Sequence, residues 1–179
     1  MRTATIVLVA YVLGVVISAV WRYMPGFAHD AIPALGALTA AYLGHTTRPY
    51  RVPAIAGAVV LGYLIDVISG TPPGLSSLVL AIIADIGRAT QQRIFVRGTA
   101  MTIGYSAFIA VLAGVSKIFL SVLFGIARPP VGLELQQIAL IALATAIAGP
   151  AVWKLFRRID AAYARTHRER DAALEGLVP

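Results

Sequence analysis

The sequence predicts an all-α integral membrane protein with six transmembrane helices. Of its 179 residues, 59% are hydrophobic and only 13% are charged, whereas about 25% of the residues of a soluble domain are charged. Six apolar segments follow one another, and the basic residues between them alternate from loop to loop. At about 20 residues for each span plus short loops, the length suits one six-helix domain, residues 1–159, with a cytoplasmic tail, residues 160–179.

The first three predicted helices are close to the minimum length for a span. The segment Ala4–Val20 has 17 residues, about 25 Å of helix, which is just enough to cross a bilayer. It follows a basic start like that of a signal peptide. However, the run Ala19-Val-Trp-Arg22 lacks the small-x-small pattern of a cleavage site, so we expect an uncleaved helix. The second segment, Ala31–Thr46, is short and rich in small residues, and the third is Pro53–Ser69.

The last three predicted helices are Leu75–Ile86, Thr99–Ile126 and Leu133–Phe156. The first of these is short, and we expect it to continue through Arg88 toward Gln92, with its end at the headgroups. Prolines and glycines favour tight turns and stop helices. They mark the loops on the side opposite the basic ones, in Pro25-Gly26, Pro72-Pro73-Gly74 and Pro129-Pro130.

The segment after Phe156 has the pattern of an amphipathic helix that leaves the bilayer. Phe156, Ile159 and Tyr163 recur at intervals of three and four between polar residues, which places them on one helix face. Trp153 fits an anchor at the membrane interface. We expect residues 160–179 to be cytoplasmic and to be loosely ordered from about Thr166 onward.

The basic residues predict how the chain crosses the membrane. Twelve of the 15 lie before the first segment or at or beyond the end of the second, fourth or sixth, whereas the intervening loops hold only Arg22 and Arg128. Because cytoplasmic loops carry an excess of Lys and Arg, both termini are predicted to be cytoplasmic. The net charge of +7 then reflects contact with lipid headgroups and not with nucleic acid. The expected headgroup-facing residues are Arg48, Arg51, Arg88, Arg93, Arg97, Arg157 and Arg158.

Asp66 is the most informative residue, because a carboxylate at membrane depth is costly unless it faces protein or water. Ala54, Ala58 and Gly62 precede it at intervals of four and form a close-packing stripe on nearly the same face. Three interpretations are open: an ion pair with Lys117, a cap or polar network at the following turn, and a transport site. The pair is geometrically allowed, since the two residues differ in depth by about 6 Å.

No motif in the sequence predicts an enzyme. Asp85 lies three residues before Arg88, which favours a local ion pair at the interface, and it is too far from Asp66 for a proton relay. The chain has no cysteine, no phosphate-binding loop and no nucleophile elbow. His29, His45 and His167 lack the close spacing of a metal site. We therefore expect no catalytic residue, no metal and no cofactor.

Small residues at intervals of four are the most frequent special pattern. In lipid they allow helices to approach closely, so most of them are expected to pack the six helices together. Any stripe left uncovered is a candidate for docking a partner helix. Besides the stripe before Asp66, the sets are Ala10, Gly14 and Ser18; Gly36, Ala40 and Gly44; and Ala110 with Gly114.

The stretch Gly62-Tyr-Leu-Ile-Asp66-Val-Ile-Ser-Gly70-Thr-Pro72-Pro-Gly74-Leu75 resembles the MreD family of bacterial rod shape-determining membrane proteins. The likeness is a glycine-bearing helix that reaches an Asp, followed by a Ser-Gly-x-Pro-x-Gly turn into the next apolar helix. Length, six spans and an ending like Leu155-Phe-Arg-Arg-Ile-Asp160 agree over roughly residues 4–163. The chain is richer in alanine than the family members, and its tail beyond Arg165 matches none of them.

The resemblance implies a non-enzymatic scaffold of cell elongation and peptidoglycan synthesis in the bacterial cytoplasmic membrane. Such proteins bind the single-span partner MreC and, through it, RodA with a class B penicillin-binding protein and MreB. The helix-packing or partner-docking residues would be Ala54, Ala58, Gly62, Gly70, Pro72 and Gly74. The fold would be similar to the substrate-binding subunits of energy-coupling-factor vitamin transporters, and that role is the alternative. The short outer loops and few polar residues there disfavour it.

Overall fold

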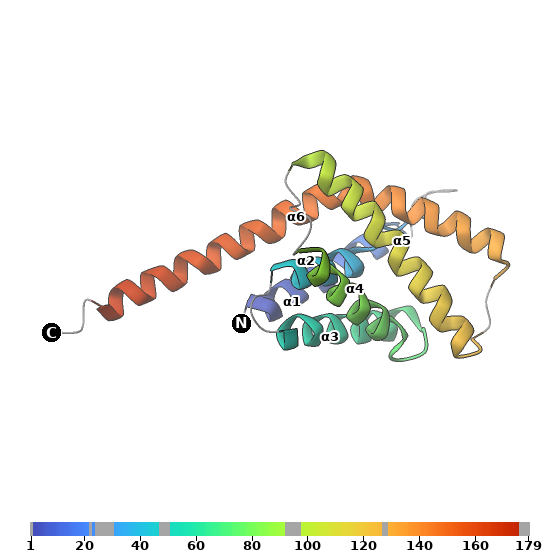
Figure 1. Ribbon diagram of the computed structural model, residues 1–179, viewed down its shortest axis with the longest axis horizontal. Helices are drawn as coiled ribbons and strands as arrows, with labels where there is room; N and C mark the ends of the chain where they lie inside the picture. Colours follow the sequence, from blue (N-terminus) through green and yellow to red (C-terminus); the bar gives the residue numbers. More distant parts are fainter. Residues whose placement is uncertain are drawn as a thin grey trace.

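The computed structural model describes residues 2–21, 23, 31–46, 51–91, 98–126 and 129–175. These residues form six helices and no strand (Figure 1), which confirms the all-α prediction. The helices are α1 (Arg2–Trp21), α2 (Leu35–Thr46), α3 (Arg51–Ser69), α4 (Leu75–Gln91), α5 (Thr99–Leu123) and α6 (Val131–Glu175).

Two helices differ from the expected bounds in ways that matter. Helix α2 begins four residues late, at Leu35, because Pro33 lies in an extended lead-in whose Ala34 N–H donates to Thr145 Oγ1 of α6 over 2.9 Å. Helix α6 has 45 residues, about 68 Å, and forms the long arm in Figure 1. It runs without a break past residue 159 and through Thr166, where we expected order to be lost. As predicted, α4 continues past Arg88.

Four helices are long and apolar enough to cross a membrane, namely α1, α3, α5 and α6 up to Thr166. Much of their surface is exposed and apolar, including Val12, Phe108, Phe119 and Ile147. Such a surface is suited to lipid and not to water. The described residues thus include four helices of the length and apolar character that a multi-pass membrane protein requires. Helix α2, with 12 residues, is about 18 Å long and too short to span about 30 Å, so six spans and cytoplasmic termini stay predictions.

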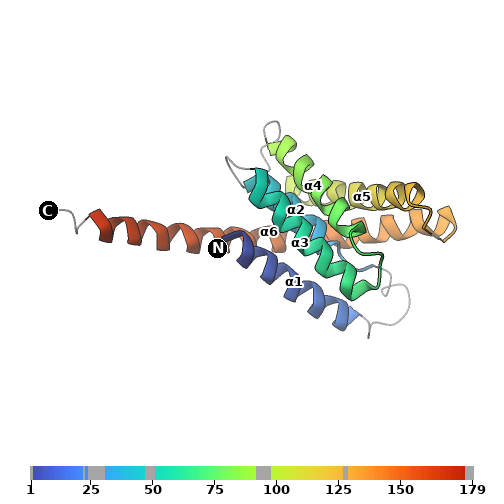
Figure 2. The same cartoon turned by 90° about the horizontal axis from the view of Figure 1, so that it is seen from below.

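Helix α2 lies at the centre of the bundle, with nine of its 12 residues buried. Its glycine stripe confirms the packing prediction. A Cβ added at Gly44 would collide with the carbonyl of Ala84 on α4, and one at Gly87 of α4 would come within 2.7 Å of Ala41 O. Only glycine permits two backbones to approach this closely. Figure 2 shows α2, α3 and α4 side by side.

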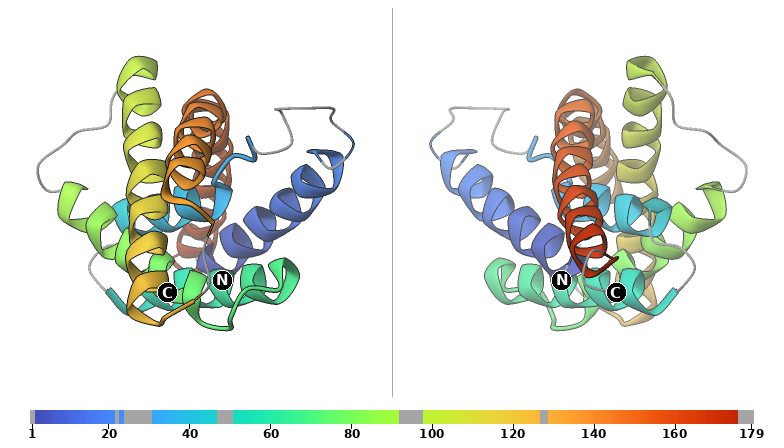
Figure 3. Two further views of the ribbon diagram at one scale, coloured as in Figure 1. Left: turned by 90° about the vertical axis from the view of Figure 1, so that its right-hand side faces the viewer. Right: turned by 90° about the vertical axis from the view of Figure 1, so that its left-hand side faces the viewer.

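Helix α1 packs on the bundle most closely through its first half. Ile6, Val7 and Ala10 are buried, but the described side chains after Ala10 are half-buried or exposed, and no atom lies within 4 Å of a Cβ added at Gly14. Figure 3 shows α1 leaning away from the other helices toward its C-terminal end. Within the stripe Ala10, Gly14 and Ser18, the described residues therefore bury Ala10 and leave Gly14 and Ser18 partly or wholly uncovered.

Candidate functional site

The Asp66 carboxylate caps the turn between α3 and α4. Asp66 is only 1% exposed, and its Oδ1 accepts a hydrogen bond from Thr71 Oγ1 at 2.7 Å. Its Oδ2 accepts the N–H of Gly74 at 2.9 Å, and the N–H of Ser76 lies 3.1 Å from both oxygens. These donors would otherwise be unsatisfied at the start of α4. An acidic acceptor is favourable there because the helix N-terminus is positive.

The turn that Asp66 caps depends on two glycines. Gly70 and Gly74 have φ angles of 64° and 100°, in the left-handed region that only glycine adopts without strain. Between them, Pro72 and Pro73 are exposed, and the Leu75 N–H donates to Pro72 O at 3.2 Å. The stretch from Asp66 to Leu75 therefore folds as one preorganised turn whose exposed residues are uncharged.

The stripe before Asp66 packs inside the chain. Ala54, Ala58 and Gly62 are all buried. A Cβ added at Gly62 would lie 2.5 Å from both the N and the Cα of Ser77, and Ser77 Oγ donates to Val59 O at 3.0 Å. The stripe thus holds α3 against its neighbours, and Asp66 lies at the end of the same seam. These three residues are not a free docking surface.

The structure shows Asp66 as a cap and not as the partner of Lys117. No described residue forms a hydrogen bond or an ion pair with Lys117, whose side chain is exposed. Lys117 instead lines a cavity of about 380 Å³ together with residues of the other helices, Gly14 of α1 and Ile138 of α6 among them. The carboxylate oxygens of Asp66 are already occupied by the turn, which removes the reason for the pair.

The predicted pair between Asp85 and Arg88 is wrong. Asp85 is exposed, whereas Arg88 is half-buried and its Nη1 has no hydrogen-bond partner among the described residues. The backbone N of Arg88 lies 3.1 Å from a Cβ added at Gly44 of α2, so Arg88 lies beside the seam between α2 and α4, whereas Asp85 lies on the exposed side of α4. Of the expected headgroup residues, Arg157 and Arg158 are exposed. Arg48, Arg93, Arg97 and the side chain of Arg51 lie outside the described residues, as do His29 and the side chain of His167.

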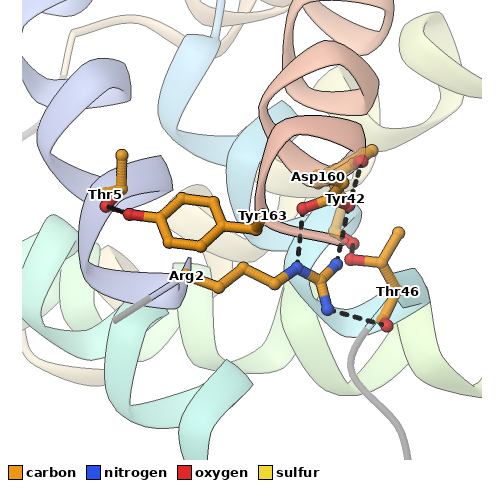
Figure 4. Close-up of polar contacts among 6 residues, drawn as sticks. All are labelled: Arg2, Thr5, Tyr42, Thr46, Asp160 and Tyr163. Carbon is orange, nitrogen blue, oxygen red and sulfur yellow. Dashed lines mark hydrogen bonds and ion pairs between the residues drawn. The ribbon is translucent and has the colours of Figure 1, made fainter. Parts of the chain in front are cut away.

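Sequence reasoning missed a polar cluster, which we call the terminal clasp: Arg2, Tyr42, Thr46 and Asp160, with Thr5 and Tyr163 beside them (Figure 4). Arg2 Nε and Nη2 donate to the two oxygens of Asp160 at 2.6 and 2.7 Å, a bidentate ion pair. The Tyr42 hydroxyl donates to Asp160 Oδ2 at 2.6 Å, and Arg2 Nη1 donates weakly to Thr46 O at 3.5 Å. The clasp joins the start of α1, the end of α2 and the middle of α6.

A second contact of the clasp fixes the C-terminal part of α6. The hydroxyls of Thr5 and Tyr163 lie 2.5 Å apart, Phe156 is buried and Ile159 packs against the core. This confirms that the predicted apolar face of the tail helix lies against protein. Trp153 is not an interfacial anchor: it is 3% exposed and packs edge-on against Tyr42 and Tyr105, with ring centroids 5.1 and 5.8 Å away.

We expect Asp160→Ala to weaken the fold measurably. The substitution leaves the Tyr42 hydroxyl and the Arg2 guanidinium without their acceptor, and hydrogen bonds to charged groups are worth about 1.5–3 kcal/mol. Because the two ion-pair side chains are 36% and 22% exposed, screening reduces the expected cost to about 1–2 kcal/mol. Thermal unfolding in detergent measures it. Asp85→Ala is the matched control, and equal losses for the two variants would contradict the clasp.

The described residues form a helical bundle with four candidate membrane spans, an acid-capped turn at one end and an ion-paired clasp at the other. Comparison with known protein families, with curated proteins and with solved structures finds no match to the chain.

Proposed function

We propose that this protein is a non-enzymatic scaffold of the MreD type in the bacterial cytoplasmic membrane. In this role it binds an MreC-like single-span protein through transmembrane helix packing and, through that partner, supports RodA with its penicillin-binding protein, and MreB. The observation that carries the proposal is the capping of the turn between α3 and α4 by the buried Asp66 carboxylate. The stretch that resembles the family is also the stretch in which a buried acid holds a positive-φ Pro-Gly turn.

The arrangement of Asp66 supports a scaffold over a pump or an ion carrier. Acidic residues that take part in transport through membranes face a pathway or a partner charge. The Asp66 carboxylate instead accepts hydrogen bonds from Thr71, Gly74 and Ser76 of the turn that follows it. The function then lies in the shape that the turn holds and in the exposed apolar side of α3. That side includes Val60, Tyr63 and Val67, all more than half exposed, and it is free to meet another helix in lipid.

Affinity purification from native membranes in mild detergent tests the proposal. We expect an MreC-like single-span protein to co-purify with the wild type and to be reduced several-fold by Val67→Trp, which enlarges a residue on the exposed side of α3. Val122→Trp, at a similarly exposed position of α5 (60% against 64%), is the matched control. Recovery of the wild type without any such partner would overturn the proposal.

The alternative function is the substrate-binding membrane subunit of an energy-coupling-factor vitamin transporter. The cavity beside Lys117 favours it, since about 380 Å³ lies within the range of small-molecule sites, about 300–1,000 Å³. The same purification distinguishes the two functions. Co-purification of an ATPase module together with a bound vitamin would support the transporter and exclude the scaffold.

A further inference from the structure

We propose that the cavity beside Lys117 binds one anionic phospholipid of the surrounding membrane, with an acyl chain inside the cavity and the phosphate at the Lys117 ammonium. The proposal does not depend on the partner proposed above, because the purified chain alone is sufficient to test it.

The cavity exists because α1 leaves the bundle. Its wall on that side is formed by Ala10, Gly14 and Ser18 of α1, and the opposite wall includes Ala110 and Gly114 of α5. None of the described α1 side chains beyond Ala10 is buried, and the space in front of Gly14 is empty. Figure 3 shows the divergence of α1 that separates these walls. A space between diverging transmembrane helices is open to lipid, so lipid chains are the molecules that reach it.

The lining selects an amphiphile with a negative charge. Most of the side chains around the cavity are aliphatic, as at Ile17, Leu61 and Ile138, and of the described residues that line it only Lys117 is charged. Lys117 lies six residues before the end of α5 at Leu123, about 9 Å inside the helix end. An unpaired ammonium at that depth is unfavourable in lipid, and no described residue neutralises it. A phosphate at the same depth would do so.

The shape of the gap favours an acyl chain over a partner helix as the occupant. Helix α1 is buried against the bundle at Ile6, Val7 and Ala10, so the gap closes toward the start of α1. A helix is about 10 Å across, whereas an acyl chain is only about 4 Å thick, the contact distance between carbon atoms. A partner helix can therefore lie on the outside of the bundle without competing for this space.

Native mass spectrometry of the protein released from nanodiscs tests the site. The nanodiscs contain equal parts of phosphatidylglycerol and phosphatidylcholine, which share acyl chains and differ in net charge. We expect the wild type to retain one phosphatidylglycerol and to prefer it at least fivefold over phosphatidylcholine. Lys117→Gln should abolish the preference. Lys154→Gln, which removes the exposed lysine of α6 outside the cavity, should leave it unchanged.

A second pair of variants tests the cavity itself. Gly14→Leu adds a side chain where the wall is open, which helix propensity favours, and it should abolish retention of both lipids. Gly104→Leu is the matched control, because Gly104 of α5 also has open space in front of it but does not line the cavity. Full phosphatidylglycerol retention by Gly14→Leu, or an unchanged preference for phosphatidylglycerol in Lys117→Gln, would overturn the proposal. Equal retention of the two lipids by the wild type would also overturn it. The same holds if added oleate replaces the phospholipid, or if the mass of the wild type shows a bound water-soluble molecule in place of a lipid.

Failure of this inference and failure of the proposed function are distinguishable. A chain that retains phosphatidylglycerol but captures no single-span partner supports the lipid site and overturns the scaffold. A chain that captures the partner but retains no phosphatidylglycerol supports the scaffold and overturns the lipid site.

Discussion

Asp66→Leu is expected to lower the stability of the detergent-solubilised protein by about 2–4 kcal/mol. Leucine has the branched shape of aspartate but no acceptor, so the N–H groups of Gly74 and Ser76 and the Thr71 hydroxyl lose their shared partner. A fully buried donor left unsatisfied costs about 1–3 kcal/mol, and the total here is smaller than three such losses because Thr71, Gly74 and Ser76 are only half-buried. Asp66→Asn keeps one acceptor oxygen, so its stability should lie between that of the wild type and that of Asp66→Leu. Thermal unfolding followed by circular dichroism in a mild detergent measures the loss.

Two control variants test whether capping the turn is the role of Asp66. Asp85→Leu removes an exposed acid from α4 and should change the melting temperature little. In protein freed of lipid, Lys117→Met should also leave the melting temperature unchanged, because Lys117 makes no ion pair with a described residue, whereas loss of a buried pair with Asp66 would lower it. If Lys117→Met lowered stability as much as Asp66→Leu, the cap would not be the role of the acid.

Gly62→Val is expected to be the most damaging single substitution in the seam between α3 and α4. The new Cβ would lie 2.5 Å from the backbone of Ser77, and neither helix can yield locally, because the Asp66 turn ties their ends together. Overpacking against side chains costs about 1–3 kcal/mol, and a backbone obstacle costs more. We expect most of the variant to aggregate after extraction and the remainder to unfold at a clearly lower temperature.

The control for this prediction is Gly104→Val. Gly104 is also a helix-interior glycine, but it is exposed and no atom lies within 4 Å of its added Cβ. The same substitution there should leave the monodisperse fraction on size-exclusion chromatography unchanged. Equal behaviour of the two variants would show that the predicted close approach of α3 and α4 does not exist in solution.

Features set by neighbouring residues could be predicted from the sequence. The apolar runs predicted six helices, the continuation of α4 past Arg88 and the apolar face of the tail helix at Phe156, Ile159 and Tyr163. All of these are confirmed, because helix formation and amphipathic spacing act within a few turns. The stripe that ends at Asp66 was predicted to lie in a packed seam for the same reason. The exception is Asp85 with Arg88. Their local spacing predicts an ion pair, but Arg88 lies half-buried beside α2, whereas Asp85 is exposed.

Features that join distant parts of the chain could not be predicted. Arg2 and Asp160 are 158 residues apart, and in the sequence Arg2 was only one more charge that set topology. In the sequence Trp153 has the position of an interfacial anchor, but in the fold Tyr42 and Tyr105 pack against its ring. The only available signal for the clasp was an isolated acid, Asp160, after a run of basic residues.

By itself the sequence determined the helical fold class, the apolar segments from which the six helices form, and Asp66 with its Pro-Gly turn as the unusual feature. Tertiary structure alone decided between the interpretations of Asp66, by placing Gly74 and Ser76 within hydrogen-bond distance and leaving Lys117 beside a cavity. The physical reason is that hydropathy and turn propensity are properties of short segments. The partner of a buried charge depends on the angles at which whole helices pack, and no short segment encodes those angles.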